Sequence, residues 1–171
     1  MIATADPDSY TKDMNSDEDP SRPEDSWADA WRGVLFANAR VLQVAEPDLV
    51  AKVGYPLTWL DVLAQLYDSP EHGLRIQEIQ ERSLFTRSGI TRLIDRMEAA
   101  GYVRREPVKG DRRGVRVELT PEGLQAHEQG FAAHLPVIER EFGRRLTPDQ
   151  QRAVAEALAP FWREPNAQRG D

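Results

Sequence analysis

The amino-acid sequence predicts a mainly α-helical fold with one small β-hairpin, an α+β arrangement. Over most of residues 26–99, apolar residues recur at steps of three and four, which is the spacing of helices that bury one face. Over residues 115–119 every second residue is apolar, which is the period of a half-buried strand. Thr-Pro pairs at 120–121 and 147–148 combine an N-cap with a proline at the first helical position, so each predicts a further helix.

Three helices are expected before residue 85. The first begins at Ser26, and Glu46-Pro47 should end it because the residue before a proline is pushed out of helical geometry. The second covers about residues 57–68 and is apolar nearly all round, so it should be buried. The third is shorter, at about residues 75–82.

The fourth helix has one apolar and one polar face. Its apolar stripe consists of Ile90, Leu93, Ile94 and Met97. Thr86 is expected to be its N-cap and Gly101 its C′ residue. The opposite face is polar and contains Ser88, Thr91, Arg92, Asp95, Arg96 and Ala99.

A hairpin follows directly, with YVRREPV and VRVELT as strands and KGDRRG as its tip. Two short helices, a polar-faced helix and a hairpin with an arginine-rich tip form the plan of a winged helix-turn-helix. Small or hydrogen-bonding residues early in a recognition helix allow it to approach base edges, and Ser88, Gly89, Thr91 and Arg92 supply them. Arg112 and Arg113 are placed at the wing tip, where a protruding cation can enter the minor groove.

The C-terminal part predicts two more helices. The helix after Thr120 contains a Pro136 that should kink it. Its apolar residues are spaced by seven, four, three and four, and they are Leu124, Phe131, Leu135, Ile138 and Phe142. The last helix is expected at about residues 148–163.

The charge of the chain is divided unevenly. The net charge is −7, yet residues 75–116 contain 11 of the 22 Lys and Arg and 6 of the 29 Asp and Glu, a local net of +5. A basic block in an acidic protein is typical of a nucleic-acid contact. Phosphate contact and an ordinary solvated strand face both remain open for Arg104, Arg105, Lys109 and Arg116.

Other features narrow the class of protein. The acidic residues 1–24 predict a disordered tail and not a signal peptide, and no apolar run is long enough to span a membrane, so a cytoplasmic protein is expected. There is no cysteine, and the common phosphate-binding and hydrolase motifs are missing, so we expect neither an enzyme nor a cofactor. His72, His127 and His134 include no pair at i, i+4, so no metal site is predicted.

The string TRSGITRLIDRMEAAGYVRREPVKGDRRGVRVELTPEG, residues 86–123, resembles the MarR family (multiple antibiotic resistance regulators). The resemblance extends over roughly residues 26–163, although Pro136 departs from it. It implies a homodimer whose N- and C-terminal helices interleave, a minor-groove role for Arg113, and a pairing of Asp111 with Arg113. The expected DNA-binding residues are Thr86, Arg87, Ser88, Gly89, Thr91, Arg92, Arg96, Lys109, Asp111, Arg112 and Arg113.

The resemblance also suggests a ligand. Family members commonly bind small aromatic or phenolic anions. Trp27, Trp31, Asp61, Arg92 and Arg105 resemble the ligand residues of the urate-responsive branch. An aromatic wall, an arginine and an orienting carboxylate suit a planar anion. If Arg92 served both DNA and ligand, the ligand would favour a dimer that cannot bind DNA.

The sequence therefore predicts four regions: a disordered acidic tail at 1–24, an N-terminal dimerisation helix at 25–48, a DNA-binding lobe at 55–120 and C-terminal dimerisation helices at 121–165. The expected function is a regulator, in the first place a repressor, that binds a pseudo-palindromic operator in double-stranded DNA as a homodimer. The alternative is a winged-helix module that acts only through protein contacts.

Overall fold

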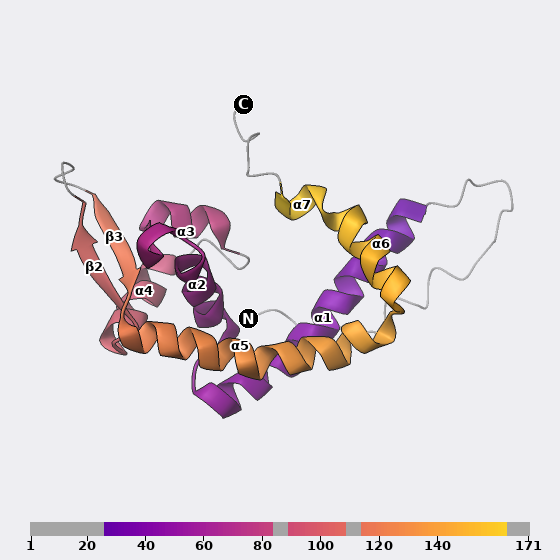
Figure 1. The fold of residues 1–171 in the computed structure, drawn as a ribbon, viewed down its shortest axis with the longest axis horizontal. Helices are drawn as coiled ribbons and strands as arrows, with labels where there is room; N and C mark the ends of the chain where they lie inside the picture. Colours follow the sequence, from indigo (N-terminus) through magenta and orange to yellow (C-terminus); the bar gives the residue numbers. More distant parts are fainter. Residues whose placement is uncertain (1–25, 84–88, 109–113, 164–171) are drawn as a thin grey trace, which may run out of the picture. The chain divides into compact units, whose positions relative to one another are not determined.

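A computed structural model describes residues 26–83, 89–108 and 114–163 (Figure 1). The chain divides into two compact units between Phe36 and Ala37. The described elements, in chain order, are α1 (Ser26–Val53), α2 (Leu57–Tyr67), η2 (Pro70–His72), β1 (Gly73–Arg75), α3 (Ile76–Arg82), α4 (Ile90–Ala99), β2 (Val103–Pro107), β3 (Val115–Leu119), α5 (Pro121–Glu141), η3 (Gly143–Arg145), α6 (Pro148–Leu158) and α7 (Pro160–Arg163). Within these residues, no helix is both long and apolar enough to cross a membrane.

The core lies where α2, α3, α4 and the sheet meet. Val62, Leu63 and Leu66 of α2 are fully buried, as the nearly continuous apolar character of this helix predicted. Ile79 of α3 and Val117 of β3 are also without exposed surface. Each such side chain contributes about 1.5–3 kcal/mol by leaving water, so this cluster stabilises the lobe that carries the fourth helix and the hairpin.

The sheet has three antiparallel strands in the order β1-β3-β2. The predicted hairpin forms β2 and β3, with Val103 opposite Leu119 and Pro107 opposite Val115. The third strand, β1, was not predicted. It has three residues, too few to display a period of two, and it follows two residues with positive φ, Glu71 and His72.

The first helix does not end at Glu46-Pro47. It continues through Pro47 to Val53 and ends at Gly54, which has a φ of +81° and whose N–H donates to the Val50 oxygen at 3.0 Å. Continuing the helix keeps Ala45 and Leu49 on one side, four residues apart, and both are buried. Burial of this stripe therefore outweighs the local preference of proline.

The fourth helix and the last helix also differ from expectation. α4 begins at Ile90, with Gly89 as N-cap at a φ of +99°, so the predicted N-cap Thr86 was wrong. A residue in this left-handed conformation cannot continue a right-handed helix, which fixes the start of α4 after Gly89. The predicted helix at 148–163 is divided at Ala159 into α6 and α7, because Pro160 has no N–H for the helical bond.

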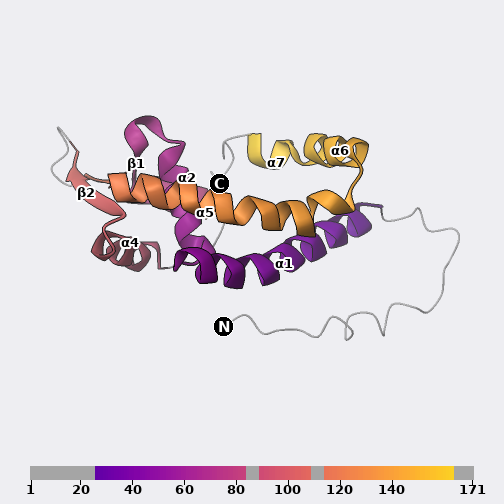
Figure 2. The same cartoon turned by 60° about the horizontal axis from the view of Figure 1, so that its bottom comes forward.

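α5 joins the lobe to the C-terminal helices. Thr120 caps it by accepting the Gly123 N–H at 3.0 Å, and Pro121 is its first residue, as predicted. The helix runs through Pro136 without a break to Glu141. The hairpin and α6 are located near opposite ends of α5 (Figure 2).

Candidate nucleic-acid interface

The fourth helix has the two faces that the sequence predicted. Ile90, Leu93, Ile94 and Met97 are buried against the lobe. Ala100, Gly101 and Tyr102 end the helix in a Schellman motif, in which the Gly101 N–H donates to the Glu98 oxygen at 2.9 Å and the Tyr102 N–H to the Met97 oxygen at 3.0 Å. Because the apolar face is buried, the opposite face of α4 is turned toward solvent.

The exposed face of α4 carries two arginines that have no acidic partner among the residues that the structure describes. Thr91, Arg92, Asp95 and Arg96 are exposed. Within the described part of the chain, neither Arg92 nor Arg96 takes part in an ion pair. A free guanidinium on an exposed helix keeps all its donors available for phosphates or base edges.

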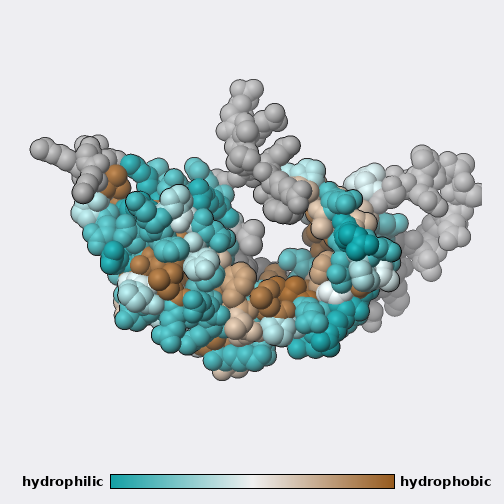
Figure 3. All heavy atoms as spheres, in the orientation of Figure 1, coloured by the Kyte–Doolittle hydropathy of each residue, from teal (hydrophilic) through white to brown (hydrophobic). Residues whose placement is uncertain are grey.

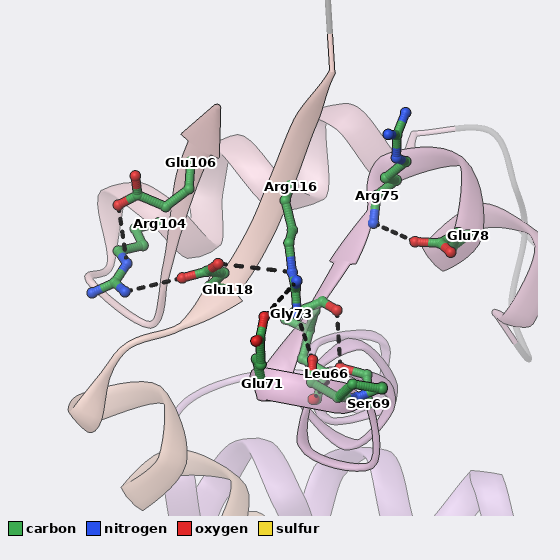
Figure 4. A network of polar contacts seen from close by, with 11 residues as sticks. Leu66, Ser69, Glu71, Gly73, Arg75, Glu78, Arg104, Glu106, Arg116 and Glu118 are labelled. Atoms are coloured by element: carbon green, nitrogen blue, oxygen red, sulfur yellow. Dashed lines mark hydrogen bonds and ion pairs between the residues drawn. The ribbon is translucent and has the colours of Figure 1, made fainter. Parts of the chain in front are cut away.

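The arginines on the outer face of the hairpin are engaged with acidic residues instead (Figure 4). Arg104 forms ion pairs with Glu118 at 2.9 Å and Glu106 at 3.2 Å. Arg116 pairs with Glu71 at 3.0 Å and lies 3.7 Å from Glu118. Arg104 lies opposite Glu118, and Glu106 opposite Arg116, so the four side chains alternate in charge on one face of the sheet.

Arg116 also holds the turn before β1. Its guanidinium donates to the main-chain oxygen of Pro70 and passes over Gly73, where a Cβ would overlap it. The neighbouring Glu71 has a φ of +54°, an uncommon conformation for this residue type, and accepts from Arg116. Arg104 and Arg116 therefore form ion pairs inside the protein and are not simply solvated.

Arg105 points to the other side of β2, where α4 lies. Its Nη2 donates to the Asp95 carboxylate at 2.6 Å and its Nη1 to the Glu98 carboxylate. Its main-chain N–H donates to the second oxygen of Glu98 at 3.1 Å. Burial disfavours the charge of Arg105, but the bonds to Asp95 and Glu98 outweigh burial and raise the pKa of the guanidinium.

Several predicted DNA-binding residues lie outside the described residues: Thr86, Arg87, Ser88, Lys109, Asp111, Arg112 and Arg113. The structure does place the strands that carry the wing tip. The Val108 N–H donates to the Gly114 oxygen at 3.0 Å, which closes the hairpin next to these tip residues.

Of the predicted ligand residues, Asp61 and Arg105 bond to other groups, and Trp27 and Trp31 belong to a different unit from the rest. Asp61, half-buried on α2, accepts from the Ser83 hydroxyl at 2.9 Å. Arg105 is held by Asp95 and Glu98, so an anion would compete with two carboxylates for it. Trp27 and Trp31 belong to the first unit and are 71% and 57% exposed.

Sequence reasoning missed an aromatic cluster that joins the lobe to α5. Tyr55, Trp59 and Tyr102 have ring centroids 5.8–6.2 Å apart. The Tyr55 hydroxyl donates to the Ala126 oxygen of α5 at 2.5 Å, and burial together with the nearby Tyr102 raises the pKa of Tyr55 to about 12. The four-residue step from Tyr55 to Trp59 was a signal, but Tyr102 is distant in sequence.

Two helices that precede an exposed fourth helix with two arginines on its surface, followed by a hairpin, define a winged helix-turn-helix protein. The MarR family profile matches residues 53–114. The chain is 30% identical over 138 residues to the HTH-type transcriptional regulator TtmR of Methylorubrum extorquens, which covers 80% of this chain and 67% of that protein. The chain belongs to the MarR family of transcriptional regulators, as the resemblance predicted.

Two further comparisons support this assignment. PrsX of Escherichia coli, an HTH-type transcriptional regulator, is 41% identical over 90 residues, 53% of this chain and 54% of that protein, so the match spans about half the length of this relative. A MarR family regulator of Streptomyces coelicolor, solved in complex with DNA, superposes with a TM-score of 0.71 at 28% identity, over 83% of this chain and 91% of that one. These relatives are transcriptional regulators and not enzymes, in agreement with the sequence prediction.

Proposed function

We propose that this chain is a sequence-specific transcriptional regulator that reads double-stranded DNA with α4. The observation that carries the proposal is the exposed face of α4, where Arg92 and Arg96 have no acidic partner within the described residues, although nearby hairpin arginines do. Free cations on a helix that fits the major groove supply both phosphate contacts and base contacts. The DNA complex of the similar Streptomyces coelicolor regulator supports this use of the fold.

The proposal assigns the hairpin tip, residues 109–113, to the minor groove. The tip contains Lys109, Arg112 and Arg113, and β2, which leads to it, packs against α4. A helix in the major groove and a cationic loop in the adjacent minor groove read one half-site together.

We include a homodimer in the proposal because the chain leaves large apolar side chains uncovered outside the lobe. Phe131 and Leu135 of α5 and Phe161 of α7 are exposed, the last by 84%. In the first unit Trp27, Trp31 and Phe36 are exposed as well. Figure 3 shows hydrophobic surface open to solvent in the region of the long helices. Apolar surface of this extent favours a partner, and a second copy would place two α4 helices on a pseudo-palindromic operator.

Repression and ligand release complete the proposal. A dimer that occupies an operator at a promoter blocks transcription, and binding of a small aromatic or phenolic anion releases it. The ligand part is supported by the resemblance at Asp61 and Arg92. Urate and 4-hydroxybenzoate are the probes: release of bound DNA by either supports this part, and unchanged DNA affinity with both argues against it.

The test is selection of bound duplexes from a random-sequence library with the full chain, followed by affinity measurements over a range of salt concentrations. A DNA reader enriches a two-fold symmetric sequence, and its affinity falls by about 0.9 log unit per phosphate contact per log unit of salt. No enrichment, or an affinity that does not depend on salt, would favour the alternative of a module for protein contacts.

Two substitutions make the test specific. Arg92→Ala should weaken binding by about 1–3 kcal/mol, whereas Arg104→Ala, which removes an arginine already paired with two glutamates, should change it by less than about 0.5 kcal/mol. Equal effects of both substitutions would contradict the assignment of α4 as the reading helix. Arg113→Ala, expected to cost about 1–3 kcal/mol, tests the wing tip separately.

A further inference from the structure

The reading face of α4 includes an acid in an unexpected place. Asp95 stands between Arg92 and Arg96 in sequence, on the exposed side of the helix, and its side chain is 57% exposed. A carboxylate on a surface that approaches phosphates repels them. Asp95 therefore needs a compensating cation if α4 binds DNA.

Arg105 supplies that cation from the hairpin. Its guanidinium bonds to Asp95 at 2.6 Å and also to Glu98, which lies one helical turn further along α4. The main-chain N–H of Arg105 adds a third bond, to Glu98. One residue of β2 thus fixes two positions of α4, and it neutralises the acid that faces the DNA side.

The guanidinium of Arg105 is poorly placed to bind phosphate itself. Its side chain is 26% exposed, less than half the exposure of Asp95, and both of its terminal nitrogens are engaged by carboxylates. Arg104, the preceding residue, provides the contrast: it points to the outer face of the sheet, where it forms ion pairs with Glu106 and Glu118.

We propose that Arg105 is a positioning residue for DNA binding, which acts through Asp95 and Glu98 by masking acidic charge on α4 and tying that helix to the wing. This inference rests on the proposed function. It assigns to Arg105 a role inside the protein, in place of a direct contact with DNA or with a ligand.

The experiment is a double-mutant cycle on the full chain, with the duplex that the wild-type protein selects from a random library. Arg105→Gln should weaken binding about tenfold, because it leaves Asp95 unmasked. Asp95→Asn alone should change the affinity by less than about threefold, because the charge it removes is already compensated. In the Arg105→Gln background, Asp95→Asn should recover most of the loss, and Arg104→Gln is the matched control with less than about threefold effect.

The dependence on salt separates this role from a phosphate contact. In the Arg105→Gln/Asp95→Asn variant, the slope of log affinity against log salt should equal that of the wild type. A slope smaller by about 0.9, with no recovery of affinity, would mean that Arg105 binds a phosphate and would overturn the inference. An unchanged affinity of Arg105→Gln would overturn it too.

Folding of each variant is verified by thermal unfolding. If Arg105→Gln does not fold, Arg105→Lys replaces it, since lysine keeps the charge but lacks the fork that reaches two carboxylates. Its loss of affinity should again be relieved by Asp95→Asn, and an unrelieved loss counts against the inference. If the wild-type chain selects no duplex, the proposed function and this inference both fail, whereas selection by the wild type with an additive cycle removes only the inference.

Discussion

Arg104 and Arg105 are neighbours in the sequence, yet they serve different parts of the protein because successive side chains of a strand point to opposite faces. Arg104 pairs across the hairpin with Glu118, and Arg105 reaches α4. The sequence predicted a basic block, but it could not indicate which of these arginines form ion pairs inside the protein and with which acids. The pairing depends on the register of β2 against β3 and on how close α4 lies to the sheet.

Close packing at a single residue gives the first prediction. A Cβ at Gly123 would overlap the main-chain oxygen of Tyr102, which cannot rotate away because it also accepts the Thr120 N–H at 3.1 Å. Gly123→Ala should therefore lower the free energy of unfolding by about 1–3 kcal/mol, as measured by denaturant unfolding. Gly143→Ala is the control, since its Cβ would meet only the Glu139 side chain at 3.8 Å. Equal stability of both variants would contradict the prediction.

His127 gives a prediction of pH dependence. Its ring lies 4.1 Å from that of Tyr67 and 4.8 Å from that of Phe131, measured between centroids. Burial lowers its pKa below the ordinary 6.5 and His72 adds to this effect, while Asp68 and Glu128 oppose it. Since the folded state then binds fewer protons than the unfolded chain, the contribution of His127 to stability is complete above pH 6.5 and decreases as the pH falls below it.

The measurement is the unfolding midpoint at several values between about pH 8 and pH 5. His127→Phe keeps an aromatic ring in the stack and should reduce the loss of stability on acidification. His134, whose pKa is also lowered by burial, accounts for a further part, so His134→Phe should reduce the loss as well. Curves that coincide with the wild type for both variants would show that these rings do not control the dependence.

At the scale of elements, the sequence predicted helix ends correctly where neighbouring residues alone determine them. The caps at Thr120 and Thr147, each followed by proline, and the glycine end of α4 are local devices, and the structure contains all three. The predictions that were wrong involve competition with distant residues. Pro47 did not end α1, because Ala45 and Leu49 are buried on both sides of it.

Pro47 therefore remains in a helix at a cost. It is exposed, it donates no helical hydrogen bond, and replacement by alanine in a helix interior is favourable by about 3 kcal/mol. Loss of the stiffness that proline gives to the unfolded chain offsets up to about 1 kcal/mol of this gain. Pro47→Ala should thus raise the free energy of unfolding by about 2 kcal/mol, measured by thermal or denaturant unfolding.

Pro121 is the matched control for this prediction. It occupies the first position of α5, where a missing N–H removes no helical bond. Pro121→Ala should not stabilise the protein. A gain of equal size at both positions would show that the interior location of Pro47 is unimportant.

At the scale of the whole molecule, the exposed apolar residues of α5 predict how the chain associates. Leu135 is 52% exposed although it lies in the apolar stripe that the sequence predicted for this helix. The residues of α5 that are buried in the single chain include the small Gly123, Ala126 and Gly130. A period of apolar residues could not indicate whether a face packs inside one chain or between two.

Leu135→Asp should convert the protein from a dimer to a monomer in sedimentation velocity, because a charge would be buried in the apolar interface. The lobe should remain folded, since Leu135 is not part of its core. Gln129→Asp, an exposed position on the same helix, should leave the dimer intact. A monomeric wild type, or a dimer that persists in the Leu135→Asp variant, would count against the homodimer.

The small residues along α5 have a mechanical consequence. A Cβ at Gly130 would overlap the Tyr55 hydroxyl and approach Leu60 to 2.7 Å, so the helix backbone rests directly on the lobe. The Tyr55 side chain in this contact is itself held to α5, because its hydroxyl donates to the Ala126 oxygen. The 21 residues of α5 extend over roughly 30 Å. Over this length, a rotation of about 5° about one end of the helix displaces the other end by roughly 3 Å, which is about the length of a hydrogen bond.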